Sequence, residues 1–329
     1  MSEAPDAVLV CRLSAIGDLV LTLPVVSALR RTFPAARLEY LSREPFGRIL
    51  RDVSAIDALH LWPGPGHPPP AAVTAREWDV VVDLSASGRS RRLLAAVKRR
   101  RLLRARKQPL ARFGFVRLRA LGFRGAGIRR AVDRQLETIA PLGIEVGPES
   151  RRPRFDVPEP PPEGPLLIAP GAGRPTKCWP AERFRDIARR AVERGRAVRV
   201  LGSARERELA DEVAQGLPPD RVRVAIAEDP AALPGLVAGC PVALGNDSAI
   251  THVAEACGAA AVVLFGPTHP AFGFGPLDPR STVLSVELDC RPCDLHGPPA
   301  CPRGHHRCLR DLSVDDVWDA VAARLGRAG

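Results

Sequence analysis

Residues 7–18 read AVLVCRLSAIGD, and this stretch decides how the chain folds. Residues 7–13 form a short, apolar, β-branched run that is typical of a strand buried on both faces in a parallel sheet. Residues 19–31 are expected to be helical, and Gly17 permits the sharp turn that joins the two. Asp18 therefore falls where a strand's carboxyl end meets a ligand-binding edge of an α/β sheet.

The same strand-helix alternation continues along the chain and is interrupted once. A chain of 329 residues exceeds what one hydrophobic core usually supports, and seven prolines crowd into residues 147–165, as in a stiff linker. We therefore expect an α/β protein of two Rossmann-like domains with a cleft between them. The expected parts are a first domain over 1–150, a linker over 151–165, a second domain over 166–312 and a terminal helix over 313–329, capped by Ser313.

Particular strands and helices follow from the pattern. Further strands are expected over 37–41, 58–61, 79–83, 166–169, 197–201, 221–225, 242–245 and 261–265. Further helices are expected over 91–98, 132–139, 181–194, 206–215, 248–257 and 314–325.

Charge is distributed unevenly along the sequence. Residues 84–132 contain 16 Lys and Arg and no Asp or Glu, so with a total of +11 the remainder of the chain carries −5. This asymmetry favours an anionic partner such as nucleic acid, a membrane surface or an acidic substrate. A solvated face enriched in arginine is the simpler alternative.

Composition narrows the choice of class. No run of about 18 apolar residues is present, so a membrane-spanning helix is not expected. The first residues lack the pattern of a signal peptide, and we expect a cytoplasmic protein. Aromatic residues make up only 5% of the chain, and we find no nucleic-acid-binding module, so nucleic acid is not the expected partner.

A glycine-rich loop over 170–180 follows one expected strand. Its sequence is PGAGRPTKCWP. Backbone amides at Gly171 and Ala172 could approach a phosphate closely, and Lys177 offers a point charge. The spacing matches neither a Walker A loop nor a dinucleotide fingerprint. A plain glycine turn remains the alternative.

A second polar loop, GNDSAITH over 245–252, also joins a strand to a helix. Asp247 or Ser248 could simply cap that helix. The functional interpretation is that free amides at the helix start bind a diphosphate. Glu206, in the turn after another strand, could accept hydrogen bonds from ribose hydroxyls, and residues 265–268 close a further strand.

Asp18 has two interpretations as well. In the first, the carboxylate lies in the first turn of the helix and acts as a cap. It could instead serve as a general base that takes a proton from an acceptor hydroxyl.

Taken together, these residues resemble glycosyltransferase family 9, the ADP-heptose:lipopolysaccharide heptosyltransferases. The resemblance covers nearly the whole chain. The matching positions are residues 14–18, Leu23 and Pro24, residues 170–172, Lys177, Trp179 and Pro180, residues 246–248, His252 and residues 266–268. Two positions depart from the family pattern. Ala249 stands where glycine is common, and His269 stands where an acidic or small polar residue often follows Thr268. Within this family, the cysteine-rich tail of the chain resembles most the enzymes that add the second heptose.

The resemblance implies a GT-B fold and metal-independent, inverting transfer of heptose from ADP-heptose to the inner core of lipopolysaccharide. Asp18 would be the catalytic base. The implied donor-binding residues are Gly171, Ala172, Lys177, Glu206, Asp247, Ser248, Ala249 and His252. Arginines and a lysine of the basic segment would hold the anionic acceptor, or the inner face of the inner membrane: Arg89, Arg91, Arg92, Lys98, Arg99 and Arg100.

Four cysteines are spaced as a possible structural zinc site: Cys290, Cys293, Cys301 and Cys308. Reduced thiols in a packed loop, or disulfides, are the alternatives. Two other functions stay open at this point. One is a GT-B glycosyltransferase that uses another nucleotide sugar, and the other is a nucleic-acid-binding protein that uses residues 84–132.

Overall fold

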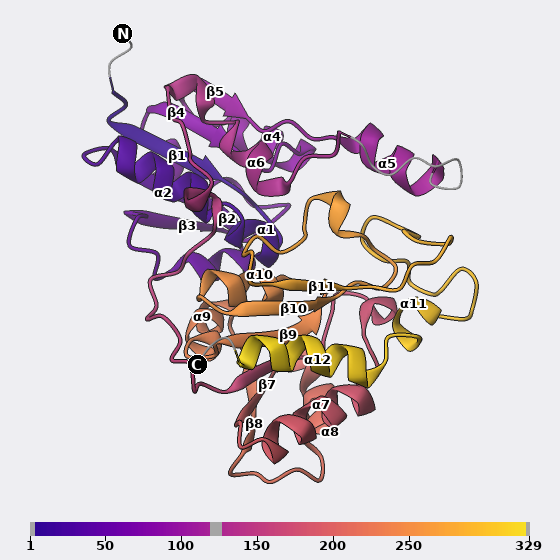
Figure 1. The fold of residues 1–329 in the computed structure, drawn as a ribbon. Coiled ribbons are helices and arrows are strands. Elements are labelled where there is room, and N and C mark those ends of the chain that lie inside the picture. Colours follow the sequence, from indigo (N-terminus) through magenta and orange to yellow (C-terminus); the bar gives the residue numbers. More distant parts are fainter. Residues whose placement is uncertain (1–3, 119–126, 327–329) are drawn as a thin grey trace. The chain divides into compact units, whose positions relative to one another are not determined.

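Two separate parallel sheets organise the computed structural model, which describes residues 4–118 and 127–326 (Figure 1). The chain divides into two compact units, each built around one sheet. The first unit comprises Met1–Lys107, Ala131–Asp156 and Asp229–Ala231, and the second comprises Gln108–Arg130, Val157–Glu228 and Ala232–Gly329. Two parallel-strand α/β units confirm the expected fold class.

The first sheet has five strands in the order β3-β2-β1-β4-β5. All its pairings are parallel. The strands are β1 (Ala7–Cys11), β2 (Arg37–Arg43), β3 (Ala58–Trp62), β4 (Trp78–Asp83) and β5 (Arg99–Arg104). The helices of this unit are α1 (Ile16–Val20), α2 (Leu23–Thr32), α3 (Ala71–Thr74), α4 (Gly88–Ala95) and α6 (Ala131–Leu136).

The opening stretch occupies the centre of this sheet. Strand β1 pairs with β2 and β4 on its two sides, and four of its five residues are buried. A strand covered on both faces needs a continuous apolar run, which is why residues 7–11 do not alternate with polar residues. The expected single helix over 19–31 is two helices, α1 and α2, because the chain turns at Leu21 and Thr22 before Pro24 enters the first turn of α2.

The second sheet has six strands in the order β11-β10-β9-β6-β7-β8, again all parallel. They are β6 (Leu166–Ala169), β7 (Val198–Ser203), β8 (Val222–Ala227), β9 (Val242–Asn246), β10 (Ala260–Leu264) and β11 (Thr282–Leu284). The helices are α5 (Pro109–Leu118), α7 (Ala181–Glu193), α8 (Arg207–Ala214), α9 (Leu233–Val237), α10 (Ala249–Ala256), α11 (Arg307–Arg310) and α12 (Val314–Leu325).

The terminal helix α12 is part of the second unit's core. Its residues Val317, Trp318 and Val321 are buried in one cluster with Phe184 of α7 and with the middle strands. As expected, Ser313 caps it, since the Ser313 hydroxyl accepts the amide of Asp316 at 3.0 Å. Of the range 313–329 assigned to this helix, the last three residues lie outside the described part.

The chain passes between the units more often than a single linker would allow. Residues 108–118 and 127–130 follow the last strand of the first unit, yet they belong to the second. Residues 229–231 belong to the first unit, where Asp229 Oδ2 accepts a hydrogen bond from Arg48 at 3.0 Å. The proline-rich stretch contains one of the passages, between Asp156 and Val157.

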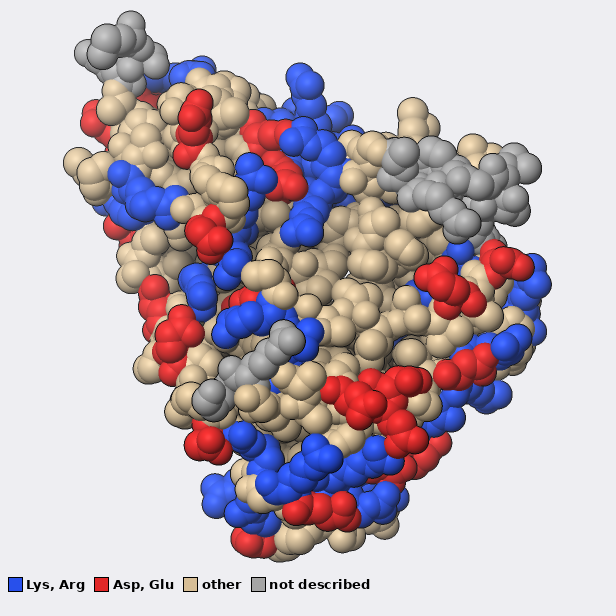
Figure 2. Space-filling model, viewed as in Figure 1, with Lys and Arg blue, Asp and Glu red and all other residues tan. Residues whose placement is uncertain are grey.

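Charged side chains cover much of the visible surface (Figure 2). Blue and red atoms lie in patches around a broad tan area in the middle of the face shown, and a strip of blue atoms lies over the part of the first unit that carries α4 and α6. Across the described residues, we find no helix with both the length and the apolar character needed to cross a membrane.

Candidate functional site

Four loops of the second unit leave the carboxyl ends of adjacent strands. They follow β6, β7, β9 and β10, and these strands are consecutive neighbours in the sheet. Because all the strands are parallel, their carboxyl ends lie at the same edge. The glycine-rich loop, Glu206, the Asn246–Ser248 turn and Thr268 are therefore brought to one edge, as a nucleotide site requires.

Asn246 joins two of these loops, a role that sequence reasoning missed. It is the last residue of β9 and is fully buried. Its amide nitrogen donates to the carbonyl of Pro170 at 2.7 Å, and its amide oxygen accepts the backbone N–H of Trp179 at 3.0 Å. Asn246 thus fixes both ends of the glycine-rich loop against the neighbouring strand.

Lys177 and Asp247 form the charged centre of this edge. Lys177 Nζ lies 2.7 Å from Asp247 Oδ2, and about one seventh of each side chain is exposed (14% and 15%). The hydroxyl of Thr268 donates to the same carboxylate oxygen at 2.6 Å. Asp247 therefore orients Lys177 instead of capping α10, and the structure adds Thr268 to the residues expected from the sequence.

The start of α10 keeps its backbone amides available. Ser248 is the N-cap residue, but its side chain makes no capping hydrogen bond. Its hydroxyl oxygen is buried and has no hydrogen-bond partner in the structure. Amides at the first turn of a helix, with the positive end of its dipole, attract phosphate oxygens. Ala249 is the first residue of this helix, and His252, one turn later, is buried in its core-facing side.

Glu206 lies against the glycine-rich loop. Its Oε2 accepts the amide of Ser203 at 2.9 Å and the hydroxyl of Ser203 at 2.7 Å. A Cβ atom on Gly171 would come within 2.0 Å of Glu206 Oε1, so any other residue there would require the Glu206 carboxylate to move. Ala172 follows as the next residue of the loop. Glu206 thus has a structural role, and its position beside the loop is compatible with a further contact to ribose.

The cysteine-rich segment contributes to the same edge. The ring nitrogen Nε2 of His306 lies 2.7 Å from the carbonyl oxygen of Thr176, and the Thr176 hydroxyl donates to the carbonyl of Pro298. A Cβ on Gly297 would lie 2.9 Å from Lys177 Cγ, and Gly297 has a φ of +86°. Residues 297–306 therefore pack directly on the loop that carries Lys177, a contact with no signal in the sequence.

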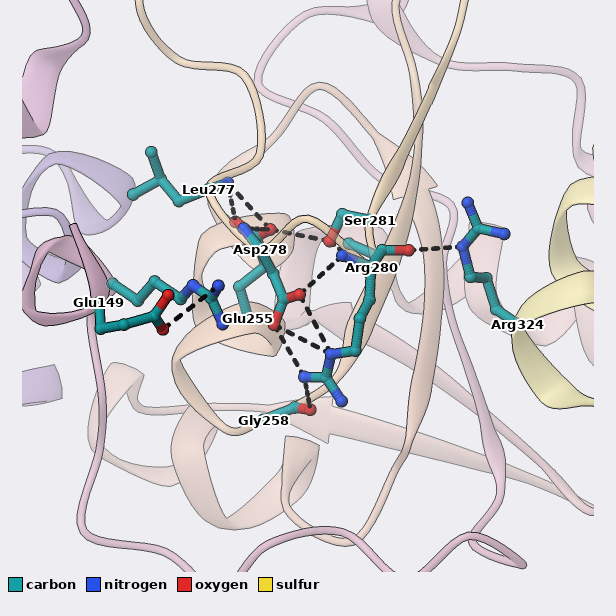
Figure 3. Close-up of polar contacts among 10 residues, drawn as sticks. Glu149, Glu255, Gly258, Leu277, Asp278, Arg280, Ser281 and Arg324 are labelled. Atoms are coloured by element: carbon teal, nitrogen blue, oxygen red, sulfur yellow. Dashed lines mark hydrogen bonds and ion pairs between the residues drawn. The ribbon is translucent and has the colours of Figure 1, made fainter. Parts of the chain in front are cut away.

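A buried carboxylate holds the segment that follows Thr268 (Figure 3). Glu255, near the end of α10, accepts the amides of Leu277 and Asp278 and the hydroxyl of Ser281, all within 3.0 Å. Arg280 in turn pairs with Asp278 at 2.8 Å. The helix whose first turn faces the site is thereby tied at its other end to the loop leaving β10.

In the first unit, Asp18 is held by an arginine. Asp18 is in the first turn of α1, and its Oδ2 lies 2.7 Å from Arg12 Nη2. Arg12 is fixed by the carbonyls of Ser14 at 2.9 Å and Leu84 at 2.7 Å. Asp18 also accepts the amide of Ala15, at a longer 3.4 Å. Its side chain remains 26% exposed, so the carboxylate is oriented and still accessible.

The basic residues expected to bind anions do not share one edge of the first sheet. Arg89, Arg91 and Arg92 are exposed on α4, which follows the carboxyl end of β4. Lys98 and Arg99 mark the start of β5, at the opposite edge from Asp18; Arg99 donates to the carbonyls of Leu94 and Val97. Arg100 is also there and lies 3.1 Å from Asp79. Part of the segment, residues 119–126, lies outside the described residues.

Arg104, which the sequence did not single out, ends β5 at the edge that carries Asp18. Its Nε donates at 3.0 Å to Asp83, a carboxylate with no exposed surface. Asp83 also accepts the amide of Ala86 at 2.9 Å and the hydroxyl of Ser90 at 3.0 Å. About a third of the Arg104 side chain (32%) is exposed. The buried carboxylate thus presents a fixed guanidinium at this edge.

The cysteines of the tail do not form a recognisable metal centre. Cys290 Sγ lies 3.9 Å from His305 Nε2, and Cys293 Sγ donates to the carbonyl of Cys290 at 3.1 Å. Within the ranges 4–118 and 127–326, no group of three or more His, Cys, Asp or Glu side chains could hold a metal ion. The arrangement does not fit zinc as it stands, and zinc on Cys290, Cys293, Cys301 and Cys308 stays a prediction that metal analysis of protein purified without chelator tests.

Comparison with known proteins gives one consistent family. Residues 142–298 match the family described as glycosyltransferase family 9 (heptosyltransferase). Lipopolysaccharide heptosyltransferase 1 of Pseudomonas aeruginosa is 28% identical over 310 residues, covering 87% of this chain and 85% of that protein. Lipooligosaccharide heptosyltransferase 2 of Haemophilus influenzae is 29% identical, but the match spans 50% of this chain and about half (49%) of that protein.

Solved structures agree on the fold. The family 9 glycosyltransferase of Veillonella parvula has a TM-score of 0.75 at 19% identity, covering 98% of each chain. The Escherichia coli ADP-heptose lipopolysaccharide heptosyltransferase II has a TM-score of 0.74 at 20% identity, covering 98% of this chain and 99% of that one. This likeness establishes the GT-B architecture.

Proposed function

We propose that this chain, whose residues 142–298 match glycosyltransferase family 9, transfers heptose from ADP-heptose to the inner core of lipopolysaccharide, at the cytoplasmic face of the inner membrane. The observation that carries the proposal is the Lys177–Asp247–Thr268 cluster beside the open first turn of α10. This combination offers a cation and free amides to a diphosphate and a carboxylate to sugar hydroxyls.

The second unit would supply donor binding and help the leaving group depart. Amides at Ser248 and Ala249 would donate hydrogen bonds to the diphosphate oxygens, while Lys177, held by Asp247, would neutralise the charge that develops as ADP leaves. No metal is required in this scheme, because the lysine and the helix terminus supply the positive charge.

The first unit would supply the base. As the acceptor hydroxyl oxygen forms its bond to the anomeric carbon, its proton passes to the carboxylate of Asp18, and the bond from that carbon to the diphosphate breaks. Direct displacement inverts the anomeric centre. Arg12 keeps the Asp18 carboxylate oriented for this proton transfer.

Substitution of Asp18 by asparagine tests the base. The amide oxygen can still accept the Ala15 hydrogen bond, but it cannot take a proton, so transfer should fall about 10²–10⁴-fold. Mass spectrometry of product formed from ADP-heptose and a truncated inner-core acceptor measures this. Stabilisation by ADP should be unchanged in a thermal-shift assay. Near-normal turnover of Asp18→Asn would remove Asp18 from the mechanism.

The donor is tested separately. At a concentration of about 100 times its dissociation constant, a ligand stabilises the folded protein by about 2.7 kcal/mol. ADP should therefore raise the melting temperature more than UDP or GDP at equal concentration. A stronger shift with UDP or GDP would identify another nucleotide sugar as the donor.

A further inference from the structure

Helix α5 carries large apolar side chains on its solvent side. In the described part of the chain, all the exposed large hydrophobic residues belong to this one helix: Leu110 is 84% exposed, Phe113 61% and Leu118 47%. Leu110, Phe113 and Arg117 are spaced three and four residues apart, so they share a face. A soluble helix normally turns its apolar residues inward, and this one presents them outward as well.

The inner side of α5 is already packed. Phe115 is 3% exposed, and its ring meets those of His269 and Phe272 edge to face, with centroids 5.1 and 5.3 Å apart. Arg112 stacks on Phe274 at 5.1 Å. The outward residues are therefore not required to hold the helix on the second unit, and they remain available to a partner.

A hollow of about 660 Å³ adjoins this apolar face. On the helix it is lined by Pro109, Arg112, Phe113, Val116 and Arg117, which lie on one side of the helix. The opposite wall belongs to the cysteine-rich segment and includes Leu295 and Pro302. Phe113 lines the hollow and is also exposed, so the hollow and the outer face form one apolar region.

The charge around this region is positive. Arg112, Arg117 and Arg303 line the hollow, together with a single acidic residue, Asp294. Arg117 also stacks over the Phe113 ring at 5.4 Å. The helix lies within the 49-residue stretch, 84–132, that has no Asp or Glu. Two copies of this chain meeting through α5 would bring these arginines together, which disfavours a homodimer through this face.

We propose that α5 docks the protein on an anionic lipid bilayer. Leu110, Phe113 and Leu118 would enter the boundary between headgroups and acyl chains, and the hollow would receive a lipid acyl chain. Arg117 and Arg303 would meet lipid phosphates. This proposal rests on the proposed function in one respect: docking on a bilayer brings the enzyme to an acceptor that is carried by a lipid.

Vesicle co-sedimentation tests the docking directly. The probes are phosphatidylethanolamine–phosphatidylglycerol vesicles and, for comparison, phosphatidylcholine vesicles. The double variant Leu110→Gln/Phe113→Gln should bind the anionic vesicles at least about tenfold more weakly, since two apolar side chains no longer leave water. Leu110→Ile/Phe113→Leu keeps the apolar surface and should bind as the parent does. Equal binding by the glutamine variant and the parent overturns the proposal.

A charge-matched pair separates a specific surface from general attraction. Arg117→Ser should weaken binding to the anionic vesicles and flatten its salt dependence. Arg189→Ser removes the same charge from α7 of the same unit and should change little. Equal losses in both variants would show that net charge alone draws the protein to lipid, and would overturn docking by α5.

Two further readouts keep the outcomes distinct. Heptose transfer to a soluble acceptor without acyl chains should be unchanged in the α5 variants. Absence of that transfer in parent and variants alike would defeat the proposed function and leave the vesicle result standing. If size-exclusion chromatography instead shows that Leu110→Gln/Phe113→Gln dissociates an oligomer without altering vesicle binding, the surface belongs to a second copy and the bilayer proposal is wrong.

Discussion

Arg100 and Arg104 lie near the two ends of one strand, and they offer a matched test of acceptor binding. Arg104 is at the edge that carries Asp18 and is fixed by the buried Asp83, whereas Arg100 pairs with Asp79 at the other edge. We expect Arg104→Ser to raise the acceptor KM by about tenfold, as for the loss of one charge-assisted contact. Arg100→Ser should leave it unchanged.

Steady-state kinetics with a varied inner-core acceptor measures both. The KM for ADP-heptose serves as the internal control and should not move. If the two variants behaved alike, the position of Arg104 beside the Asp18 edge would have no bearing on the acceptor.

The individual site residues were partly predictable from the sequence. The position of Asp18 and of the donor-loop residues after strand ends follows from strand-helix alternation, because parallel strands end at one edge. The Lys177–Asp247 pair could not be foreseen, since its members are 70 residues apart and meet only through the order of β6 and β9. Arg104 was hidden within a run of arginines, because charge alone does not say which end of a strand a residue occupies.

At the scale of elements, Asp57 joins a strand to a helix and makes stability depend on pH. Its Oδ2 accepts the amide of Leu38 in β2 and a guanidinium N–H of Arg30 in α2, both at 2.7 Å. Burial raises the pKa of Asp57, but the Arg30 and Leu38 hydrogen bonds lower it more, so the net pKa lies below its ordinary value. A lowered folded-state pKa stabilises above the unfolded pKa of about 3.9, and this stability is lost as the pH falls.

Asp57→Asn should therefore lower the free energy of unfolding by about 1 kcal/mol at pH 7, a modest value because the pair is partly exposed to solvent. The difference should shrink below about pH 3, where the wild-type carboxyl is protonated too. Urea unfolding at the two pH values measures it. Asp52→Asn, at an exposed position in the same unit, is the matched control and should be neutral at both.

The sequence pattern predicted most elements and missed those whose residues contradict the usual pattern. Strand β5 reads RRRLLR and was missed because its arginines do not form the apolar pattern of a strand. Such a sequence is tolerated at the edge of a sheet, where the arginine side chains reach solvent. Helix α5 escaped notice because apolar residues appear on both of its sides, so no single apolar stripe emerges. The break between α1 and α2 follows from local turn geometry, which periodicity does not report.

For the whole molecule, the division into units cannot be reproduced by a single cut. A fragment over 157–329 would lack Phe115, whose ring covers Phe272, a residue only 1% exposed in the intact protein. We expect this fragment to melt roughly 5 °C below a version with residues 108–130 fused to its start through a glycine-serine linker, because one aromatic burial is restored. Calorimetry compares the two. Equal melting temperatures would mean that residues 108–130 contribute nothing to the second unit's stability.

Gln108 has a consequence for how this protein could be re-engineered. Its amide nitrogen donates to the carbonyl of Gly127 at 2.8 Å, and its amide oxygen accepts the backbone N–H of Arg129 at 2.9 Å. The Gln108 side chain thus joins the residue just before α5 to Gly127 and Arg129, which follow α5 in the chain. The outward residues of α5 can be exchanged as a cassette that keeps Phe115, so that the same chemistry is delivered to a different surface without rebuilding either sheet.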